Sequence, residues 1–442
     1  MEQTVGVVSL GCAKNLVDSE LILGQLQAAG FTVTPRAEEA AVLIVNTCGF
    51  ITPAKEESVN TILELARFKT RGCCRVLLVA GCLAQRYGRE LLAEMPEIDG
   101  VLGTGAVPRV ADAVWRALSG EKVTFLGAPG YDYDTGLPRL QATPGYTAYV
   151  KIAEGCSHRC SFCAIPAIRG PYRSRSMEAV EAEVAALAAG GVKEVILVAQ
   201  DTTSYGRDLY GDYRLASLLR RLAAVPGVAW LRLLYCHPDG VTDELITAMA
   251  EEEKICSYLD LPLQHINRRI LGAMGRRGDG RYIRRLIERL RNRIPGLTLR
   301  TSLIVGFPGE TEAEFQELLD FMQEVRFERA GIFKFCPEEG THAAVLPGQL
   351  PEELKEERYH RAMAGQQKIS LEHNLSLIGR KVEVLVEGRR KDRYYGRTRG
   401  DAPEVDGRVV FTGPDRGMAS GSLVTVRVHR AGEYDLIGEL IP

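Results

Sequence analysis

Short apolar runs alternate with amphipathic segments over the first quarter of the chain. The apolar runs are rich in β-branched residues and read VGVVSL, AVLIVNT, RVLLVA and the shorter DGVLG. Apolar positions at helical spacing lie between them, most clearly over residues 15–29 and 53–66. This alternation predicts a parallel sheet with helices packed on it, a doubly wound α/β domain over residues 1–118.

A second alternation of the same kind covers residues 142–371. Its strand candidates are AYVKIA, EVILVA, AWLRLLY, SYLDLPL, LTLRTSLIV and AGIFKF. Six strand–helix units predict a parallel, partly closed barrel. The Gly- and Pro-rich residues 127–146 are typical of a linker in front of it. The charged residues 351–374 predict a long helix that leads out of the barrel.

The pattern changes again from about residue 374. Short strand candidates are now separated by Gly, Asp and Pro, and they read KVEVLVEG, YYGRT, GRVVFTG and LVTVRVHR. Residues 374–442 are therefore predicted to form a small antiparallel β-barrel of the OB-like kind. The whole chain is expected to be an α/β protein of three domains.

Composition and charge narrow the class of protein. Of the 442 residues, 45% are hydrophobic and 25% charged, which is the mix of a globular protein in water. No apolar run approaches the roughly 18 residues that span a bilayer, and the N-terminus lacks the basic start and apolar stretch of a signal peptide. A cytoplasmic location without membrane contact is expected. The net charge of -2 excludes a protein that coats nucleic acid through bulk charge.

Eleven cysteines in a reducing compartment favour metal binding or thiol chemistry over disulfides. Cys156, Cys160 and Cys163 follow the first predicted barrel strand, the end at which parallel barrels carry their chemistry. Structural zinc with His158 as fourth ligand is one interpretation, and an electron-transfer cluster, which normally takes four cysteines, is another. In a third, three thiolates hold a four-iron cluster whose open iron binds the amino and carboxyl groups of S-adenosylmethionine.

A second set of three cysteines lies in the N-terminal domain. Cys12, Cys48 and Cys82 each stand at or just beyond the carboxyl end of a predicted strand. In an open parallel sheet these ends line the crevice where ligands bind. A small buried residue is the competing interpretation for each thiol alone, but three in one topological position predict a second cluster site. The remaining cysteines are interpreted as structural or incidental: Cys73, Cys74, Cys236, Cys256 and Cys336.

The C-x3-C-x-aromatic-C motif, with Phe162 before its last cysteine, is similar to that of the radical S-adenosylmethionine superfamily. With the N-terminal cysteines and the C-terminal barrel, the chain resembles the methylthiotransferase family over nearly its whole length. The resemblance implies an N-terminal cluster domain, a radical core and a C-terminal TRAM domain. It also implies two 4Fe-4S clusters and S-adenosylmethionine. By this resemblance, the radical-generating cluster is bound by Cys156, Cys160 and Cys163, and the auxiliary cluster by Cys12, Cys48 and Cys82.

Family members act either on adenosines of transfer RNA or on a ribosomal protein. Residues 143–175, 234–238, 261–267, 300–312 and 337–341 resemble the ribosomal type. Gly170-Pro171-Tyr172-Arg173 stands where the tRNA-modifying relatives carry acidic residues. The implied reaction adds sulfur and a methyl group to the β-carbon of an aspartate in small-subunit ribosomal protein twelve. The same chemistry on a tRNA adenosine is the alternative.

The resemblance also implies how the reaction runs. An electron from a flavodoxin or ferredoxin enters the first cluster and cleaves S-adenosylmethionine, and the resulting radical removes a hydrogen from the β-carbon. Sulfur then comes from the auxiliary cluster, and a second S-adenosylmethionine supplies the methyl group. The cofactors carry this chemistry, while the protein positions them and excludes water.

The C-terminal domain supplies two charged stretches. Asp401, Glu404 and Asp406 resemble the ribosomal type and are placed to meet a basic ribosomal protein, so the substrate is expected to bind through the TRAM domain and the core. Residues 387–399 interleave two tyrosines with basic residues, which suits contact with ribosomal RNA or, alternatively, a solvated strand edge. The basic residues are Arg389, Arg390, Lys391, Arg393, Arg397 and Arg399.

Candidates for binding S-adenosylmethionine are Phe162, Gln200 and Gly306, the last in a GFPG turn. For Gln200 and Gly306, as for other polar strand ends, an ordinary turn or a satisfied polar contact is the competing interpretation. Two further classes remain open: an RNA-binding module with structural zinc, and a redox carrier with coordinatively complete clusters. Neither accounts for two sets of three cysteines at strand ends.

Overall fold

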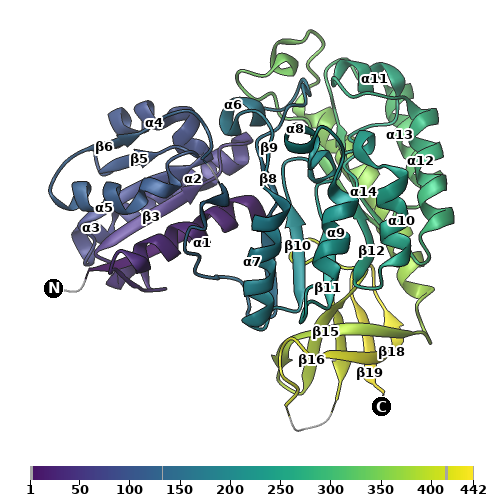
Figure 1. Ribbon diagram of the computed structural model, residues 1–442. Coiled ribbons are helices and arrows are strands. Elements are labelled where there is room, and N and C mark those ends of the chain that lie inside the picture. The colour runs from purple at the N-terminus through teal and green to yellow at the C-terminus, as the bar shows by residue number, and fades with distance from the viewer. Residues whose placement is uncertain (1–2, 132, 414–416, 442) are drawn as a thin grey trace.

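The computed structural model describes residues 3–131, 133–413 and 417–441. Three sheet-based parts follow one another along the chain, as Figure 1 shows from the purple N-terminal sheet to the yellow C-terminal barrel. The predicted α/β class is confirmed. No helix in the described ranges is long and apolar enough to cross a membrane.

The N-terminal sheet has six parallel strands in the order β2-β1-β3-β4-β5-β6. In chain order, the strands are Thr4–Ser9, Thr32–Val33, Val42–Thr47, Val76–Gly81, Gly100–Leu102 and Val123–Phe125. Helices α1 (Ala13–Ala28) and α5 (Val110–Leu118) pack on one face. Helices α2 (Thr52–Ala66) and α4 (Cys82–Glu94) pack on the other, and the short α3 (Phe68–Arg71) follows α2. The doubly wound arrangement is as predicted. The edge strands β2 and β6 were not predicted from the sequence.

The central sheet also has six parallel strands, in the order β7-β10-β11-β12-β13-β14. It is open between β7 and β14, so the predicted partly closed barrel is confirmed. Its strands are Thr147–Lys151, Glu194–Val198, Trp230–Leu233, Ile255–Asp260, Thr298–Val305 and Arg329–Lys334. A small antiparallel pair, β8 (Ala153–Glu154) and β9 (Arg173–Ser174), flanks the loop that carries the three central cysteines.

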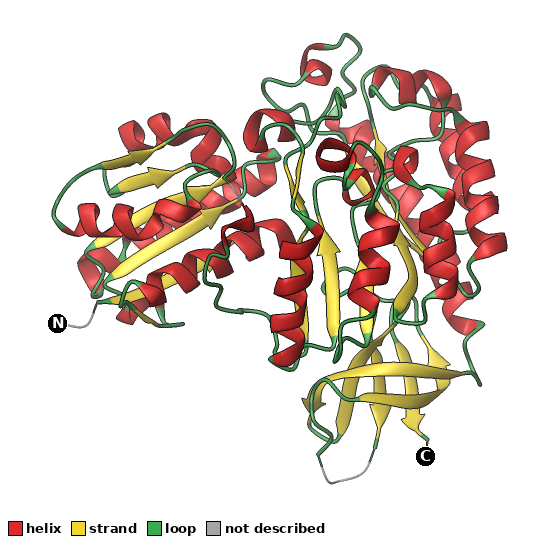
Figure 2. Cartoon of the chain, viewed as in Figure 1, coloured by secondary structure: helices red, strands yellow, loops and turns green. Residues whose placement is uncertain are grey.

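Helices cover the outer face of the central sheet (Figure 2). They are α7 (Met177–Ala189), α9 (Leu215–Ala223), α10 (Asp243–Glu251), α11 (Arg268–Ala273), α12 (Gly280–Arg293) and α13 (Glu312–Val325). Two short helices, α6 (Ile165–Arg169) and α8 (Arg207–Tyr210), lie in the connections that follow β8 and β10. The predicted long helix is α14 (Glu352–Leu375), which leads into the C-terminal domain.

The predicted linker, residues 127–146, packs tightly against both domains where it is described. A Cβ on Gly24 of α1 would stand 2.3 Å from the carbonyl oxygen of Pro138, so α1 and the linker backbone are in close contact. Arg139 forms ion pairs with Glu20 of α1 and Glu183 of α7. The linker therefore holds the N-terminal domain against the core.

The C-terminal domain is a closed barrel of five strands, in the order β15-β16-β17-β19-β18. Its strands are Lys381–Arg390, Arg393–Thr398, Val409–Thr412, Leu423–Ala431 and Leu436–Leu440. The small OB-like barrel is as predicted, but β19 was missed. Leu385 and Ala402 of this domain pack in one apolar cluster with Tyr149, Trp230 and other side chains of the central sheet.

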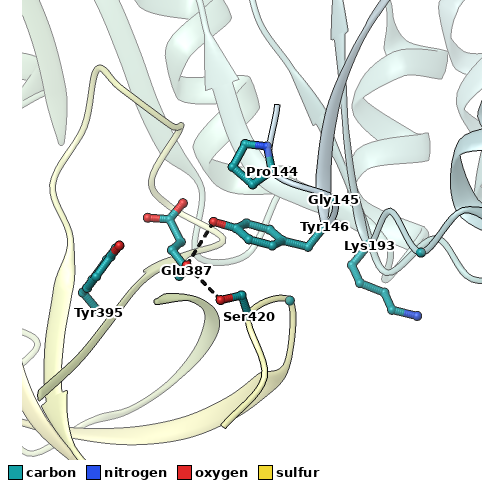
Figure 3. Close-up of a pocket in the computed structure, with 9 residues that line it drawn as sticks. Pro144, Gly145, Tyr146, Lys193, Glu387, Tyr395 and Ser420 are labelled. Carbon is teal, nitrogen blue, oxygen red and sulfur yellow. Dashed lines mark hydrogen bonds between the residues drawn. The ribbon is translucent and has the colours of Figure 1, made fainter. Parts of the chain in front are cut away.

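A pocket of about 570 Å³ lies at the seam between the core and the C-terminal barrel (Figure 3). Tyr146 and Ser420 donate hydrogen bonds to the carbonyl oxygen of Glu387, at 3.3 and 3.1 Å. Tyr146 precedes β7 and Lys193 precedes β10, so this pocket lies at the amino ends of the strands. The two cysteine sets lie at the opposite, carboxyl ends.

Candidate active site

Cys12, Cys48 and Cys82 converge at the carboxyl edge of the N-terminal sheet. Cys12 is the N-cap of α1, Cys48 directly follows β3, and Cys82 begins α4. Strands β1 and β3 are neighbours, but the chain continues from β1 to β2 on one side and from β3 to β4 on the other. Open parallel sheets bind ligands at such a switch point. A Cβ on Gly11 would stand 2.8 Å from the Cβ of Cys48, so only glycine lets these turns meet.

The three thiols have different electrostatic surroundings. Burial raises the pKa of Cys48 to about 11 and also raises the pKa of Cys82. Burial acts on Cys12 too, but the charges of Lys14 and Arg169 outweigh it and lower the pKa of this thiol. The site therefore supplies cations that stabilise at least one thiolate, the form in which cysteine binds metals.

Cys156, Cys160 and Cys163 share one loop, which is held firmly in place. The amide of Ser161 donates to Met274 and its hydroxyl donates to Ala273, at 2.9 and 2.7 Å. Arg276 lies 3.9 Å from the sulfur of Cys160. Burial raises the pKa of Cys156 to about 11 and that of Cys163 to about 12, while the Arg276 charge opposes both shifts.

The short helix α6 connects the two cysteine sets. It begins two residues after Cys163, and its Ile168 packs with Ala164 against Cys82. The hydroxyl of Thr104, from the N-terminal domain, donates to the carbonyl of Ile168 at 3.0 Å. Helix α6, which lies between the domains in Figure 1, therefore connects the loop of the central cysteines with Cys82 of the N-terminal set.

Arg169 ends this helix and takes part in a buried network of charges that sequence analysis missed. Its guanidinium bonds Asp18 and Glu154, both at 3.0 Å, and the side-chain oxygen of Asn15 at 3.2 Å. Lys151 pairs with the same two carboxylates. Because Asp18 is distant in sequence from Arg169 and sits within a helical pattern, nothing in the sequence signalled this contact.

The suggested fourth ligand of a structural zinc site has other partners in the structure. Within the described ranges, no three His, Cys, Asp or Glu side chains are grouped to hold one metal ion. His158, the suggested fourth zinc ligand, instead lies 2.6 Å from Asp201 and stacks on His237 with ring centres 4.0 Å apart.

The candidates for S-adenosylmethionine lie near the same loop. Phe162 packs against the apolar cluster that contains Phe307 and Met274. Phe307 directly follows Gly306 in the sequence. Gln200 follows β10, beside the buried Asp201. The amide of Gly306 donates to the Glu310 carboxylate at 2.8 Å, so that amide is occupied within its own turn. Their role in binding stays a prediction.

The acidic stretch of the C-terminal domain is not an open docking surface, which corrects the sequence interpretation. Asp401 pairs with Arg329 at 2.7 Å, and Asp406 accepts the hydroxyl of Tyr258 at 2.6 Å. Both carboxylates are buried between the barrel and the core, where they join the two domains. Glu404 alone of the three predicted residues is exposed.

The basic stretch also divides into two parts. Arg397 is 2% exposed and pairs with Glu194 and Glu387, and Arg399 pairs with Glu383 at 3.1 Å. Tyr394 packs inside the barrel on Phe411 and is not available to stack on RNA. The exposed basic residues of this hairpin are Arg389, Arg390, Lys391 and Arg393.

Sequence profiles of three families match successive parts of the chain. The Radical SAM superfamily matches residues 150–322, Uncharacterized protein family UPF0004 matches residues 4–103, and the TRAM domain matches residues 378–441. Together with the partial barrel and its three-cysteine loop, these matches define a radical S-adenosylmethionine enzyme with a TRAM domain.

Full-length relatives identify the family. A protein from Pelotomaculum thermopropionicum is 57% identical over 440 residues, covering 99% of both chains. One from Geobacter sulfurreducens is 49% identical over 444 residues, covering 100% of this chain and 99% of the relative. Both carry the name ribosomal protein uS12 methylthiotransferase RimO. The chain belongs to this family, and it is accordingly a transferase. The predicted cofactors, two 4Fe-4S clusters and S-adenosylmethionine, are those of the family.

A solved structure shares the fold at low sequence identity. The radical S-adenosylmethionine methyltransferase TsrM from Kitasatospora setae aligns with a TM-score of 0.58 and 16% identity, covering 84% of this chain and 89% of that chain. This likeness concerns the arrangement of the domains alone.

Proposed function

We propose that the protein adds a methylthio group to the β-carbon of an aspartate in ribosomal protein uS12. Its membership of the uS12 methylthiotransferase family supports this substrate. The observation that carries the proposal is the meeting of two three-cysteine sets at strand ends, with α6 between them. One site to generate a radical and an adjacent site to supply sulfur are what the reaction needs.

The ligand assignment is part of the same proposal. Cys156, Cys160 and Cys163 hold the radical-generating cluster, and the auxiliary cluster is held by Cys12, Cys48 and Cys82. When bound, these cofactors and S-adenosylmethionine supply the hydrogen-abstracting radical, the sulfur and the methyl group. The chain holds both ligand loops in position, since α6 packs on Cys82 and the 273–276 segment fixes the central loop.

Charged side chains support the two sites. Arg276 places a cation beside the central thiolates, while Arg169 does the same for the N-terminal ones. Such cations stabilise the thiolate form. Phe162 and Gly306 belong to the wall where S-adenosylmethionine binds, with Gln200 at the neighbouring strand end. Phe162 acts through packing, since it lies in the apolar cluster that orders the loop.

Partners and location complete the proposal. The substrate protein binds across the TRAM domain and the core, and the exposed cations Arg389, Arg390, Lys391 and Arg393 are available to ribosomal RNA. A flavodoxin or ferredoxin supplies electrons, and the enzyme works in the cytoplasm. The functional units are residues 1–118 for the auxiliary site, 142–371 for the radical core and 374–442 for the TRAM domain.

The substrate assignment is tested by direct assay. The anaerobically reconstituted protein is given S-adenosylmethionine, a reductant and either uS12 or unmodified tRNA, and the products are analysed by mass spectrometry. We expect a methylthio group on one aspartate of uS12 and none on tRNA. A methylthiolated adenosine without modified uS12 would replace the proposed substrate by the tRNA alternative.

A further inference from the structure

Lys14 is a buried cation beside the N-terminal cysteines. It lies in the first turn of α1, two residues after Cys12, and its side chain is 5% exposed. Its ammonium stands 3.0 Å from the centre of the Tyr235 ring, which belongs to the core. Lys14 therefore lies where the N-terminal domain meets the carboxyl end of β11.

Lys14 differs from the other buried cations of the described chain in lacking a carboxylate partner. Eight lysine and arginine residues are buried in the described ranges, and seven of them form an ion pair with Asp or Glu. The seven are Lys151, Arg169, Arg175, Arg232, Lys355, Arg358 and Arg397. A buried charge without an opposite charge is costly, so this position calls for an anion.

The two carboxylates whose charges act on Lys14 are already engaged. Glu154 bonds Arg169 and Lys151, and Asp260 bonds Arg300 and the amide of Tyr235. The remaining anionic neighbour is the thiolate of Cys12, which the proposed function assigns to the auxiliary cluster. The charge of the auxiliary cluster and that of a bound anion then remain to compensate Lys14.

Tyr235 is suited to give way to such an anion. Its backbone has φ of 61°, a left-handed conformation that is uncommon for a bulky residue and carries strain. Its side chain is only partly buried and packs at the edge of the apolar cluster inside the barrel. The ring therefore covers the ammonium without being locked in a core.

We infer that Lys14 binds the side-chain carboxylate of the target aspartate, an inference that rests on the proposed function. The carboxyl carbon of aspartate is bonded directly to the β-carbon that receives sulfur. A carboxylate held by Lys14 beside Cys12 places that β-carbon next to the auxiliary site. The same contact selects aspartate over asparagine, because the neutral amide does not compensate the charge. The methionyl carboxylate of S-adenosylmethionine is the other source of the same chemistry.

The test measures binding without turnover. The holoenzyme, kept anaerobic and without reductant, is titrated with two fluorescent uS12 peptides, one with the target aspartate and one with asparagine in its place. We expect the wild type to bind the aspartate peptide at least about tenfold more tightly, the effect of about 1.4 kcal/mol. Lys14→Met is expected to bind both peptides at the level of the asparagine peptide, and Lys14→Arg to keep part of the preference.

Matched measurements separate the alternatives. Lys122→Met, which removes an exposed lysine before β6 of the N-terminal domain, is expected to keep the full preference. Iron content confirms that each variant holds its clusters. The inference is overturned if the Lys14→Met protein still prefers the aspartate peptide, or if its affinity for both peptides falls by the same factor. A variant that retains this preference but loses affinity for S-adenosylmethionine assigns Lys14 to the cofactor instead. If the wild type binds neither peptide, the proposed function itself fails.

Discussion

Arg169 contacts the N-terminal site although it belongs to the loop that carries the central cysteines. Its side chain is 1% exposed and bonds Asp18 and Glu154, and its charge acts on Cys12 and Cys82. A single residue thus ties the two sites together by charge. These polar contacts join residues far apart in the chain, so the sequence carries no periodic signal for them.

Replacing Arg169 by Met is expected to lower stability by about 3–5 kcal/mol, because two buried carboxylates then share Lys151 alone. The N-terminal iron should also be retained less well on gel filtration. Urea unfolding followed by circular dichroism and iron analysis measure both effects. Arg159→Met, an exposed change in the same loop, should stay within about 0.5 kcal/mol of the wild type. Equal stability of the two variants would contradict the account.

Replacing either of two helical glycines by alanine is expected to change stability, in opposite directions at the two positions. Gly24 lies inside α1, where the Pro138 carbonyl leaves no room for a Cβ. A Cβ on Gly365 of α14 would instead stand 3.6 Å from the side-chain nitrogen of Gln323, an ordinary contact distance. Intrinsic helix propensity favours alanine at both positions by about 1 kcal/mol. Only at Gly24 does packing oppose it.

We therefore expect Gly24→Ala to destabilise the protein by about 1–3 kcal/mol through overpacking against the linker. Gly365→Ala should instead stabilise it by about 0.5–1 kcal/mol. The free energy of unfolding of each variant decides the matter. The account fails here if both substitutions shift stability in the same direction.

The strands that line the two sheets were predictable because they are long and apolar. The six central strands, and β1, β3 and β4, carry such runs, whereas the three-residue β5 was predicted from the short run DGVLG. The missed strand β2 has two residues and β6 has three, while β19 contains a glycine and a glutamate. Their pairing partners, not their own patterns, make them strands.

The candidate site was predictable where chemistry and topology coincide. Cysteines at strand ends must converge in a parallel sheet, so both sets could be located from the sequence. The charged stretches of the C-terminal domain were wrongly predicted to lie on the surface, because charge alone does not reveal burial. Asp401 and Arg397 are buried by partners distant in sequence, on the other domain: Arg329 and Glu194.

The domains of the whole molecule are joined by buried charges as well as by apolar contacts. At the seam between the core and the C-terminal barrel, Glu194 receives Arg232 from the core and Arg397 from the barrel. Burial alone would raise the pKa of Glu194, but the two guanidinium groups outweigh it and lower the pKa to about 2.

The lowered pKa of Glu194 makes the stability of the protein depend on pH. The folded pKa of Glu194 lies below its usual 4.5, so its ionised form stabilises the protein above about pH 4.5. That contribution is lost as the pH falls towards 2. Glu194→Gln should be less stable by about 3–5 kcal/mol at pH 7, and the difference should shrink between pH 4.5 and 2. Urea midpoints measured across this range test the prediction, and a difference that stays constant would contradict it.

The central claim for the whole molecule is that two separate three-cysteine sites each hold a four-iron cluster. The most direct measurement is the iron and sulfide content of three reconstituted proteins: the wild type, the Cys156, Cys160 and Cys163 triple alanine variant, and the Cys12, Cys48 and Cys82 triple alanine variant. The account predicts about eight irons in the wild type and about four in each variant. About four irons in the wild type and in the N-terminal variant, with none in the central variant, would contradict it and leave a radical enzyme without a sulfur source.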